Sequence, residues 1–218
     1  MIFFDNDQKF FELLGYPMSY LEFFGTVAGA VAVWLSAKAN IWSWPVGVIN
    51  VILFFFLFYQ IQFYPDMFLQ VFFFVTNLLG WWRWSHPLVG EMGRKNELRV
   101  SWMPFRILII FSIVVLMGTI LFGTFASNLH ELFPKLFKFP SAYPYLDSFV
   151  TVVSIVATYL MVQKKIECWV AWILADMIAT YLYVAKGILF VGVEYFVFCL
   201  IAAFGFYRWR SEYKSYRA

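Results

Sequence analysis

The chain has 218 residues, of which 63% are hydrophobic and 13% are charged, and its mean hydropathy is +0.74. A soluble domain carries about 25% charged residues, so this composition indicates an integral membrane protein without a second, soluble domain. The formal net charge is only +3, and no basic tract is interleaved with aromatic residues. Both observations argue against a nucleic-acid partner.

The segment 1–19 precedes the first long apolar stretch. It lacks the basic region and the continuous apolar region of a cleavable signal peptide. Phe3, Phe10, Phe11 and Leu14 recur at helical spacing between charged residues. This pattern predicts a short amphipathic helix lying at the membrane interface, with a disordered leader as the alternative.

Seven apolar segments follow, and each approaches the roughly 20 residues that a helix needs to cross a bilayer. The predicted spans are 20–39, 43–63, 66–84, 104–127, 145–163, 167–186 and 188–209. The span 66–84 reaches this length once the Tyr and Trp residues at its ends are counted as interfacial anchors. The expected fold class is therefore an all-α integral membrane protein with seven transmembrane helices.

The basic residues predict the orientation of these spans. With the N-terminus outside, 12 of the 16 Lys and Arg residues lie on the inner side. The four that remain outside are Lys9, Lys135, Lys138 and Lys186. The positive-inside rule therefore favours an outer N-terminus and a cytoplasmic C-terminus.

A shift of 125 residues aligns the chain with itself. The aligned pairs include Tyr20 with Tyr145, Trp44 with Trp169, Gly80 with Gly205 and Trp84 with Trp209. This alignment predicts two three-helix bundles, 20–84 and 145–210, joined by a linker, 85–144, that contains the span at about 104–127. The three helices of the first bundle and the linker helix make four membrane crossings, so the chain returns to its starting side before the second bundle. Both bundles therefore enter the membrane in the same direction, as in SWEET-type sugar transporters. A seven-helix bundle without symmetry is the alternative, and 211–218 is expected to be a cytoplasmic tail.

Polar and aromatic residues recur on one face of several predicted spans, at spacings of three, four and seven residues. These are Asn50 with Gly47 and Phe54; Gln70, Phe73 and Asn77; Trp172, Asp176 and Tyr183; and Tyr195 with Phe198. Polar groups at membrane depth are costly and usually face the protein interior. We expect them to form a pocket where the two bundles meet, which stacks a flat ring and hydrogen-bonds its substituents. Helix-to-helix contacts are the alternative role.

Asp176 is the most informative of these residues. An aspartate within a span costs a few kcal/mol unless it is paired, hydrated or protonated. No Lys or Arg lies inside a predicted span away from its ends, so a cationic substrate or a coupling proton would have to neutralise Asp176. Tryptophans such as Trp44, Trp169 and Trp172 attract flat cations through cation–π interactions. They could instead be interfacial anchors.

Enzymatic chemistry has little support in the sequence. Cys168 and Cys199 lie inside predicted spans and suit packing rather than a disulfide or a metal site. His86 and His130 fall in predicted loops, and no predicted span contains a His-x-x-x-His cluster or a nucleophile-and-base pair. We therefore expect no catalytic residues, no cofactor and no metal. The chain also lacks the glycine-rich signature of an ATP-binding loop.

Several of these residues form a set that resembles the PnuC family of bacterial vitamin transporters. The set comprises Trp44-Pro45 with Asn50; Tyr64, Asp66 and Gln70; Gly80-Trp81-Trp82 and Trp84; Trp169, Trp172 and Asp176; and Lys186-Gly187. The resemblance extends over nearly the whole chain. It implies a SWEET-like 3+1+3 architecture and places Trp44, Asn50, Gln70, Trp172 and Asp176 in the substrate site. Phe73, Asn77, Tyr183 and Tyr195 are assigned to that site by helical spacing alone.

The resemblance also implies an activity. It is the facilitated uptake of nicotinamide riboside, a form of vitamin B3 and a precursor of NAD, across the bacterial inner membrane. It further implies a homotrimer in membrane lipid and a cytoplasmic nucleoside kinase that traps the substrate by phosphorylation. Two alternatives remain: a carrier of another vitamin such as thiamine or riboflavin, and a vitamin-binding subunit that depends on a separate ATPase.

Overall fold

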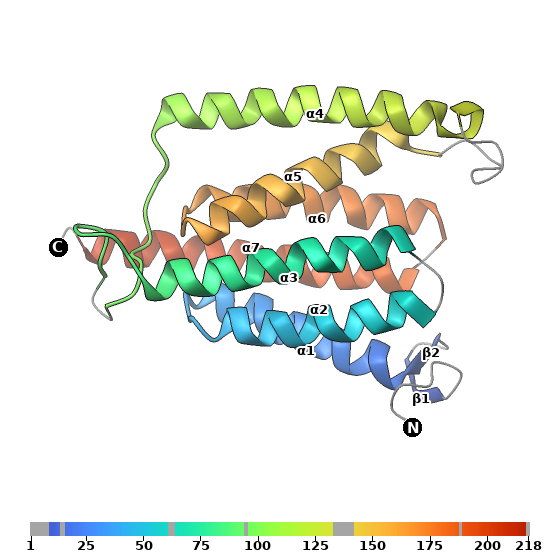
Figure 1. Cartoon of the computed structure of the whole chain (residues 1–218), viewed down its shortest axis with the longest axis horizontal. Coiled ribbons are helices and arrows are strands. Elements are labelled where there is room, and N and C mark those ends of the chain that lie inside the picture. Colours follow the sequence, from blue (N-terminus) through green and yellow to red (C-terminus); the bar gives the residue numbers. More distant parts are fainter. Residues whose placement is uncertain are drawn as a thin grey trace. The chain divides into compact units, whose positions relative to one another are not determined.

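The computed structural model describes residues 9–13, 16–60, 64–93, 96–132, 142–187 and 189–216. Their helices and strands are β1 (Lys9–Leu13), β2 (Tyr16–Ser19), α1 (Tyr20–Ala37), α2 (Ser43–Gln60), α3 (Tyr64–Ser85), α4 (Phe105–Leu132), α5 (Pro144–Val162), α6 (Glu167–Ala185) and α7 (Leu189–Ser215) (Figure 1). The predicted helical class is confirmed for this part of the chain. Each predicted span corresponds to one helix, and the largest differences in boundary are at the C-terminal ends of α4 and α7.

The N-terminal segment differs from the prediction. β1 and β2 pair as an antiparallel hairpin, with Leu13 opposite Tyr16 and Lys9 opposite Ser19. The expected amphipathic helix is therefore wrong for these strands, and residues 1–8 lie outside the described part. A helix through this segment would have met Pro17, which cannot donate a backbone hydrogen bond. Ser19 instead caps α1, because its Oγ accepts a 3.2 Å hydrogen bond from the backbone N–H of Glu22.

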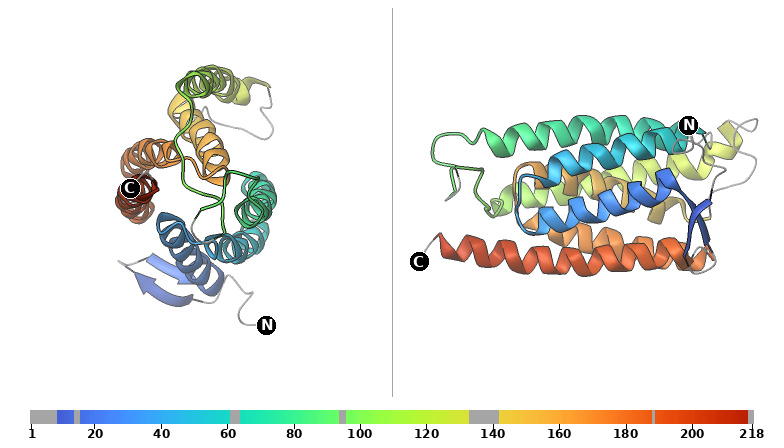
Figure 2. Two further views of the ribbon diagram at one scale, coloured as in Figure 1. Left: turned by 90° about the vertical axis from the view of Figure 1, so that its left-hand side faces the viewer. Right: turned by 90° about the horizontal axis from the view of Figure 1, so that it is seen from below.

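The chain divides into two compact units. Unit 1 comprises 1–100, 162–164 and 207–218, and unit 2 comprises 101–161 and 165–206. Within unit 1, α1 packs along α2 and α2 packs along α3 (Figure 2). Unit 2 contains α4, α5, α6 and most of α7. The last two turns of α7 belong to unit 1.

Six of the described helices are long and apolar enough to cross a membrane: α1, α2, α4, α5, α6 and the part of α7 from Val191 to Ser215. The chain is thus a multi-pass membrane protein. α3 is not among the six, and its 22 residues include Gln70, Asn77 and Arg83. The side chains of α4 are exposed along most of its length, as Ile110 at 58% and Leu121 at 65% illustrate. Such an apolar exterior is suited to lipid rather than to water.

The turns that follow α1 and α5 have the same backbone conformation at positions 125 residues apart. Ala39 and Lys164 both have a φ of 52°, which is rare for a residue other than glycine. Two backbone hydrogen bonds also match between the turns. Asn40 N–H donates to Leu35 O at 3.0 Å, and Lys165 N–H donates to Leu160 O at 2.9 Å. Likewise, Ser43 N–H donates to Asn40 O and Cys168 N–H donates to Lys165 O, both at 3.1 Å. These local matches agree with the duplication seen in the sequence.

Tryptophan–glycine contacts repeat at the same spacing. In unit 1, the ring of Trp44 lies against Gly80, where a Cβ would come within 3.0 Å of three indole atoms. In unit 2, the ring of Trp169 lies against Gly205 in the same way. Each glycine therefore allows a helix to approach a buried indole closely.

Candidate functional site

The polar face of unit 1 begins with Asn50 on α2. Its Nδ2 donates a 2.8 Å hydrogen bond to the backbone oxygen of Gly25 on α1. A Cβ at Gly29 would lie 2.9 Å from this Nδ2, so Gly29 makes room for the amide. Oδ1 of Asn50 forms no hydrogen bond with the described residues. Asn50 thus makes the helix-to-helix contact that was the alternative prediction, while it keeps an acceptor for a ligand.

Asn77 lies on α3 beside the same part of α2. Its Nδ2 donates a 2.8 Å hydrogen bond to Phe73 O on its own helix. Its Oδ1 lies against Gly47, where a Cβ would come 3.0 Å from Cγ of Asn77. Because Gly47 and Asn50 are three residues apart on α2, Asn50 and Asn77 lie within about one helical turn of each other. Gln70, three residues before Phe73, is half-buried on α3.

Trp44 is the most buried of the predicted site residues in unit 1, with 5% of its surface exposed. Its ring meets that of Trp84 edge to face, with the centroids 5.2 Å apart. The indole Nε1 is buried and has no hydrogen-bond partner among the described residues. The structure thus places Trp44 in the packing of unit 1, and its contact with substrate stays a prediction.

The polar face of unit 2 is centred on Asp176 of α6, which is only 4% exposed. Its carboxylate forms no hydrogen bond or ion pair with the described residues. Trp172 lies one turn earlier on the same face, and its buried Nε1 also has no hydrogen-bond partner in the described part of the chain. Two groups that require polar partners are therefore neighbours on one helix, and a bound ligand could supply both partners.

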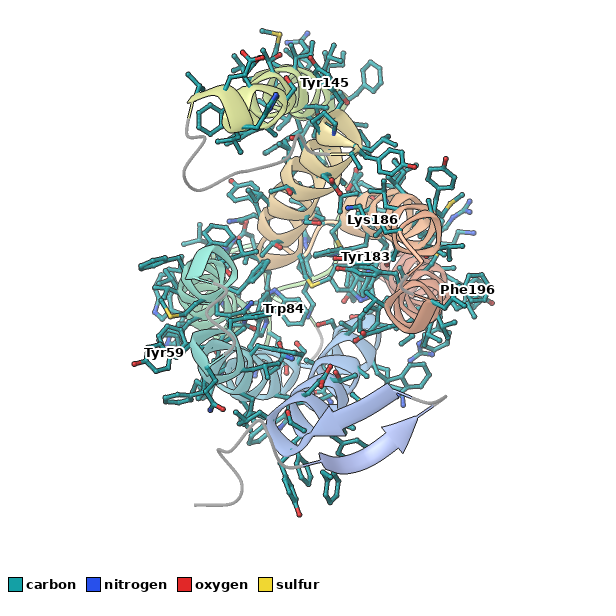
Figure 3. The ribbon with its side chains drawn as sticks, turned by 90° about the vertical axis from the view of Figure 1, so that its right-hand side faces the viewer. Tyr59, Trp84, Tyr145, Tyr183, Lys186 and Phe196 are labelled. Atoms are coloured by element: carbon teal, nitrogen blue, oxygen red, sulfur yellow. The ribbon has the colours of Figure 1, made fainter. Side chains whose placement is uncertain are left out.

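Tyr183 and Tyr195 are brought together from α6 and α7. Their rings are nearly parallel, with the centroids 5.3 Å apart and an interplanar angle of 11°. The ring of Phe198 meets Tyr195 edge to face at 6.3 Å. In Figure 3, Tyr183 and Lys186 project to one side of the α6–α7 pair, whereas Phe196, which is 54% exposed, projects to the other side. That Tyr183 and Tyr195 contact substrate stays a prediction.

Sequence reasoning missed the glycines that accommodate the polar side chains. Gly25 and Gly29 form a G-x-x-x-G spacing on α1, and both are paired with residues of α2. Small residues at this spacing mark close helix contacts in membranes, so the signal was present. The ion pair between Asp147 and Lys186 in unit 2 was also missed.

Metal and thiol chemistry find no support in the described part of the chain. It contains no group of three or more His, Cys, Asp or Glu residues that could hold a metal ion. Cys168 is buried and Cys199 is half-buried, and both are free thiols. Taken separately, unit 1 offers amide oxygens and an indole, and unit 2 offers a carboxylate, an indole and stacked phenols; groups of these kinds suit a flat, polar ligand.

Comparisons with known proteins agree with a transport role. Residues 19–211 match the family described as "Nicotinamide mononucleotide transporter". The chain is 32% identical over 212 residues to the nicotinamide riboside transporter PnuC of Escherichia coli (strain K12), covering 89% of this chain and 87% of that protein. It is 25% identical to the riboflavin/roseoflavin transporter RibM of Streptomyces davaonensis, over 91% of this chain and 88% of that protein.

A solved structure shows the same fold. The crystal structure of the vitamin B3 transporter PnuC superposes with a TM-score of 0.66, at 23% identity, over 90% of this chain and 83% of that one. These relatives are transporters, which agrees with the prediction that the chain is not an enzyme. From the family match and the 32% identity to the Escherichia coli protein, the chain belongs to the nicotinamide mononucleotide transporter family and is a membrane transporter of the PnuC type.

Proposed function

We propose that the chain carries nicotinamide riboside across the membrane by facilitated diffusion. The observation that carries this proposal is Asp176, a carboxylate that is 4% exposed and has no partner among the described residues. Nicotinamide riboside contains a flat pyridinium cation, which would neutralise the carboxylate and stack on neighbouring rings. The name of the 32% identical Escherichia coli protein supports the same substrate.

We assign substrate contacts to residues of both units. In unit 1 these are Trp44, Asn50, Gln70, Phe73 and Asn77, and in unit 2 they are Trp172, Asp176, Tyr183 and Tyr195. The amide oxygen of Asn50 is suited to the carboxamide or the ribose hydroxyls, which are hydrogen-bond donors. Trp172 is suited to stacking on the pyridinium ring, and Asp176 to its charge.

The architecture that we propose is 3+1+3, with α1–α3 and α5–α7 as parallel repeats and α4 as the linker helix. The matched turns at Ala39 and Lys164 and the matched contacts of Trp44 and Trp169 support it. α3 would be the seventh span, stabilised at its ends by Trp and Tyr anchors. The N-terminus would lie outside and the C-terminus in the cytoplasm of a bacterial inner membrane. We further propose a homotrimer and trapping of the imported nucleoside by a cytoplasmic kinase.

Binding of purified protein to candidate vitamins tests the substrate assignment. Nicotinamide riboside should raise the melting temperature, because a ligand that binds only the folded state stabilises it by mass action. Thiamine and riboflavin serve as comparison ligands. Trp172→Ala should weaken binding of nicotinamide riboside by about 1 kcal/mol or more if its ring is a stacking surface. A riboflavin response without a nicotinamide riboside response would reassign the substrate toward that of the Streptomyces davaonensis relative.

Transport by the protein alone tests the mechanism. In proteoliposomes that contain no other protein, internal nicotinamide riboside should rise to the external concentration and stop there. Absence of transport by correctly folded protein would favour a subunit that depends on a separate ATPase. Accumulation above the external concentration when a pH gradient is imposed would indicate proton coupling instead of uniport.

A further inference from the structure

Lys186 holds its ammonium group between a carboxylate and an aromatic ring in unit 2. Its Nζ lies 3.0 and 3.3 Å from the two carboxylate oxygens of Asp147. The same Nζ lies 5.8 Å from the centroid of the Tyr183 ring (Figure 3). That ring in turn stacks on Tyr195. A positive group therefore already occupies a position beside a carboxylate and a pair of stacked rings.

Helix electrostatics account for part of this arrangement. Asp147 lies in the first turn of α5, where the helix dipole favours negative charge. Lys186 is the C-cap residue of α6, where the dipole favours positive charge. These effects explain the two charges. They do not require that the ammonium lie over Tyr183.

Lys164 provides a comparison, because it makes a buried cation–π contact. Nζ of Lys164 lies 4.2 Å from the centroid of Trp84, and its side chain is only 3% exposed. The side chains of Lys186 and Asp147 are 32% and 40% exposed, and the distance to the ring is longer. Exposed ion pairs contribute little to stability, so Lys186 can leave its position at low cost.

The position is also continuous with the polar face of α6. Tyr183 lies seven residues, or two helical turns, after Asp176 on that face, a rise of about 10 Å. A flat ligand held by Tyr183 would therefore be aligned with the buried carboxylate. The arrangement has the two features of a cation subsite, an aromatic surface and a negative charge.

We propose that Asp147 and the ring of Tyr183 form a subsite for a flat organic cation, which Lys186 occupies when the ligand is absent. The inference rests on the proposed function and deepens it, because it makes Lys186 an internal competitor of a cationic substrate. When the ligand occupies this subsite, and not the position beside Trp172 and Asp176, it stacks on Tyr183, its positive charge replaces the ammonium beside Asp147, and Lys186 turns to solvent. An uncharged ligand of the same shape gains nothing from this exchange.

Three variants of the full chain test the subsite in purified protein. The ligands are nicotinamide riboside and its reduced, uncharged dihydropyridine form, and the measurement is the dissociation constant from calorimetry. Lys186→Met should tighten binding of the cation by about three- to tenfold. Asp147→Asn should weaken it by a similar factor, and the double variant should lose the gain of Lys186→Met. The reduced form should respond less than twofold.

Lys38→Met is the matched control, because Nζ of Lys38 lies 4.7 Å from the centroid of Trp34 in unit 1 and the chemical change is the same. It should leave both dissociation constants unchanged. If Lys186→Met does not fold, Lys186→Gln takes its place. An unchanged constant for the cation, or equal changes for both ligands, would overturn the inference. If the unmodified protein binds no nicotinamide riboside, the proposed function fails, and thiamine, another flat cation, tests the subsite with the same variants.

Discussion

Asp176 and Asn50 differ in how the fold satisfies their polar groups. Nδ2 of Asn50 donates a hydrogen bond to Gly25 O, and its Oδ1 remains available as an acceptor. The carboxylate of Asp176, in contrast, has no partner among the described residues. An unpaired ionised group at membrane depth costs at least a few kcal/mol. Such a cost is retained where a ligand offsets it, so Asp176 is the residue at which substrate binding and folding stability should conflict.

Asp176→Asn tests this conflict. Removal of the negative charge should weaken binding of nicotinamide riboside at least tenfold, or about 1.4 kcal/mol. The melting temperature should stay the same or rise, because an uncompensated buried charge is removed. Calorimetry and thermal unfolding measure the two effects. Glu131→Gln, at a side chain that is 73% exposed, is the control and should change neither. Unchanged affinity in Asp176→Asn would exclude its carboxylate from the site.

Asn50→Ala separates the two roles that the sequence left open for this residue. Loss of the hydrogen bond to Gly25 should lower the free energy of unfolding by about 0.5–1.5 kcal/mol. If Asn50 also contacts substrate, the dissociation constant should rise as well. Asn128→Ala is the control, since Asn128 donates to Thr124 O on its own exposed helix surface. A change in stability with unchanged affinity would leave Asn50 with the helix-to-helix role alone.

At the scale of helices and turns, close approach depends on glycine. The indoles of Trp44 and Trp169 occupy the space that a Cβ at Gly80 or Gly205 would need. The sequence revealed these glycines as aligned pairs at a shift of 125. It did not reveal what they contact, because contact partners across helices depend on how the helices rotate about their axes.

Gly80→Ala should therefore destabilise unit 1 despite the higher helix propensity of alanine. Overpacking costs typically about 1–3 kcal/mol, which exceeds the roughly 1 kcal/mol gained in propensity. Gly205→Ala should have a similar effect in unit 2. Thermal unfolding in detergent measures both. Leu79→Ala, at a residue of α3 that is 53% exposed, provides the control. A melting temperature equal to that of the unmodified protein would show that the indoles can move aside.

The segment after α3 is joined to the turn after α5 by charged side chains. Lys164 lies 3.7 Å from Glu97 and over the ring of Trp84, and Arg83 pairs with Glu91 at 2.6 Å. Glu97 is 24% exposed, whereas Lys164 is almost fully buried. Glu97 therefore places a negative charge close to the buried ammonium.

Glu97→Gln should lower the free energy of unfolding by roughly 1–3 kcal/mol, because it leaves the Lys164 ammonium without its carboxylate. Thermal or chemical unfolding of the purified protein measures this change. Lys164→Met in the Glu97→Gln background should restore part of the lost stability. If the double variant is less stable than Glu97→Gln, the ammonium is stabilised by contacts other than Glu97, such as that with the Trp84 ring.

At the scale of the whole molecule, the end of α7 belongs to unit 1. Trp209 is fully buried, and its Nε1 donates a 3.0 Å hydrogen bond to Ser36 O near the C-terminus of α1. Its ring also lies 5.9 Å from that of Trp84. Residues separated by 173 positions thus share one hydrogen bond, to a backbone carbonyl that also accepts a 2.8 Å hydrogen bond from Ala39 N–H.

Trp209→Phe should destabilise the protein by about 2–4 kcal/mol, because it removes both the donor to Ser36 and part of a buried ring. Trp82→Phe makes the same chemical change at a side chain that is 61% exposed and should have little effect. Equal melting temperatures for the two variants would contradict a structural role for this hydrogen bond.

The sequence by itself determined the membrane class, the seven helices and the residues that match at a shift of 125. These properties follow from composition and from local apolar length, which act on each segment separately. The sequence also identified Asp176, Trp172, Asn50 and Asn77 as candidates, because polar groups are conspicuous in an apolar span. It failed for 9–19, where strand pairing outweighed a helical spacing of phenylalanines.

Tertiary structure decided which polar atoms are satisfied and which remain available. Asn50 donates to Gly25, Lys186 pairs with Asp147, and Trp209 donates to Ser36. In each of these pairs, the two residues lie 25 or more positions apart in the sequence. The face of a neighbouring helix offers several possible hydrogen-bond partners, and the sequence does not distinguish between them. Close packing selects among them, because a shift of one side chain changes which donor reaches which acceptor.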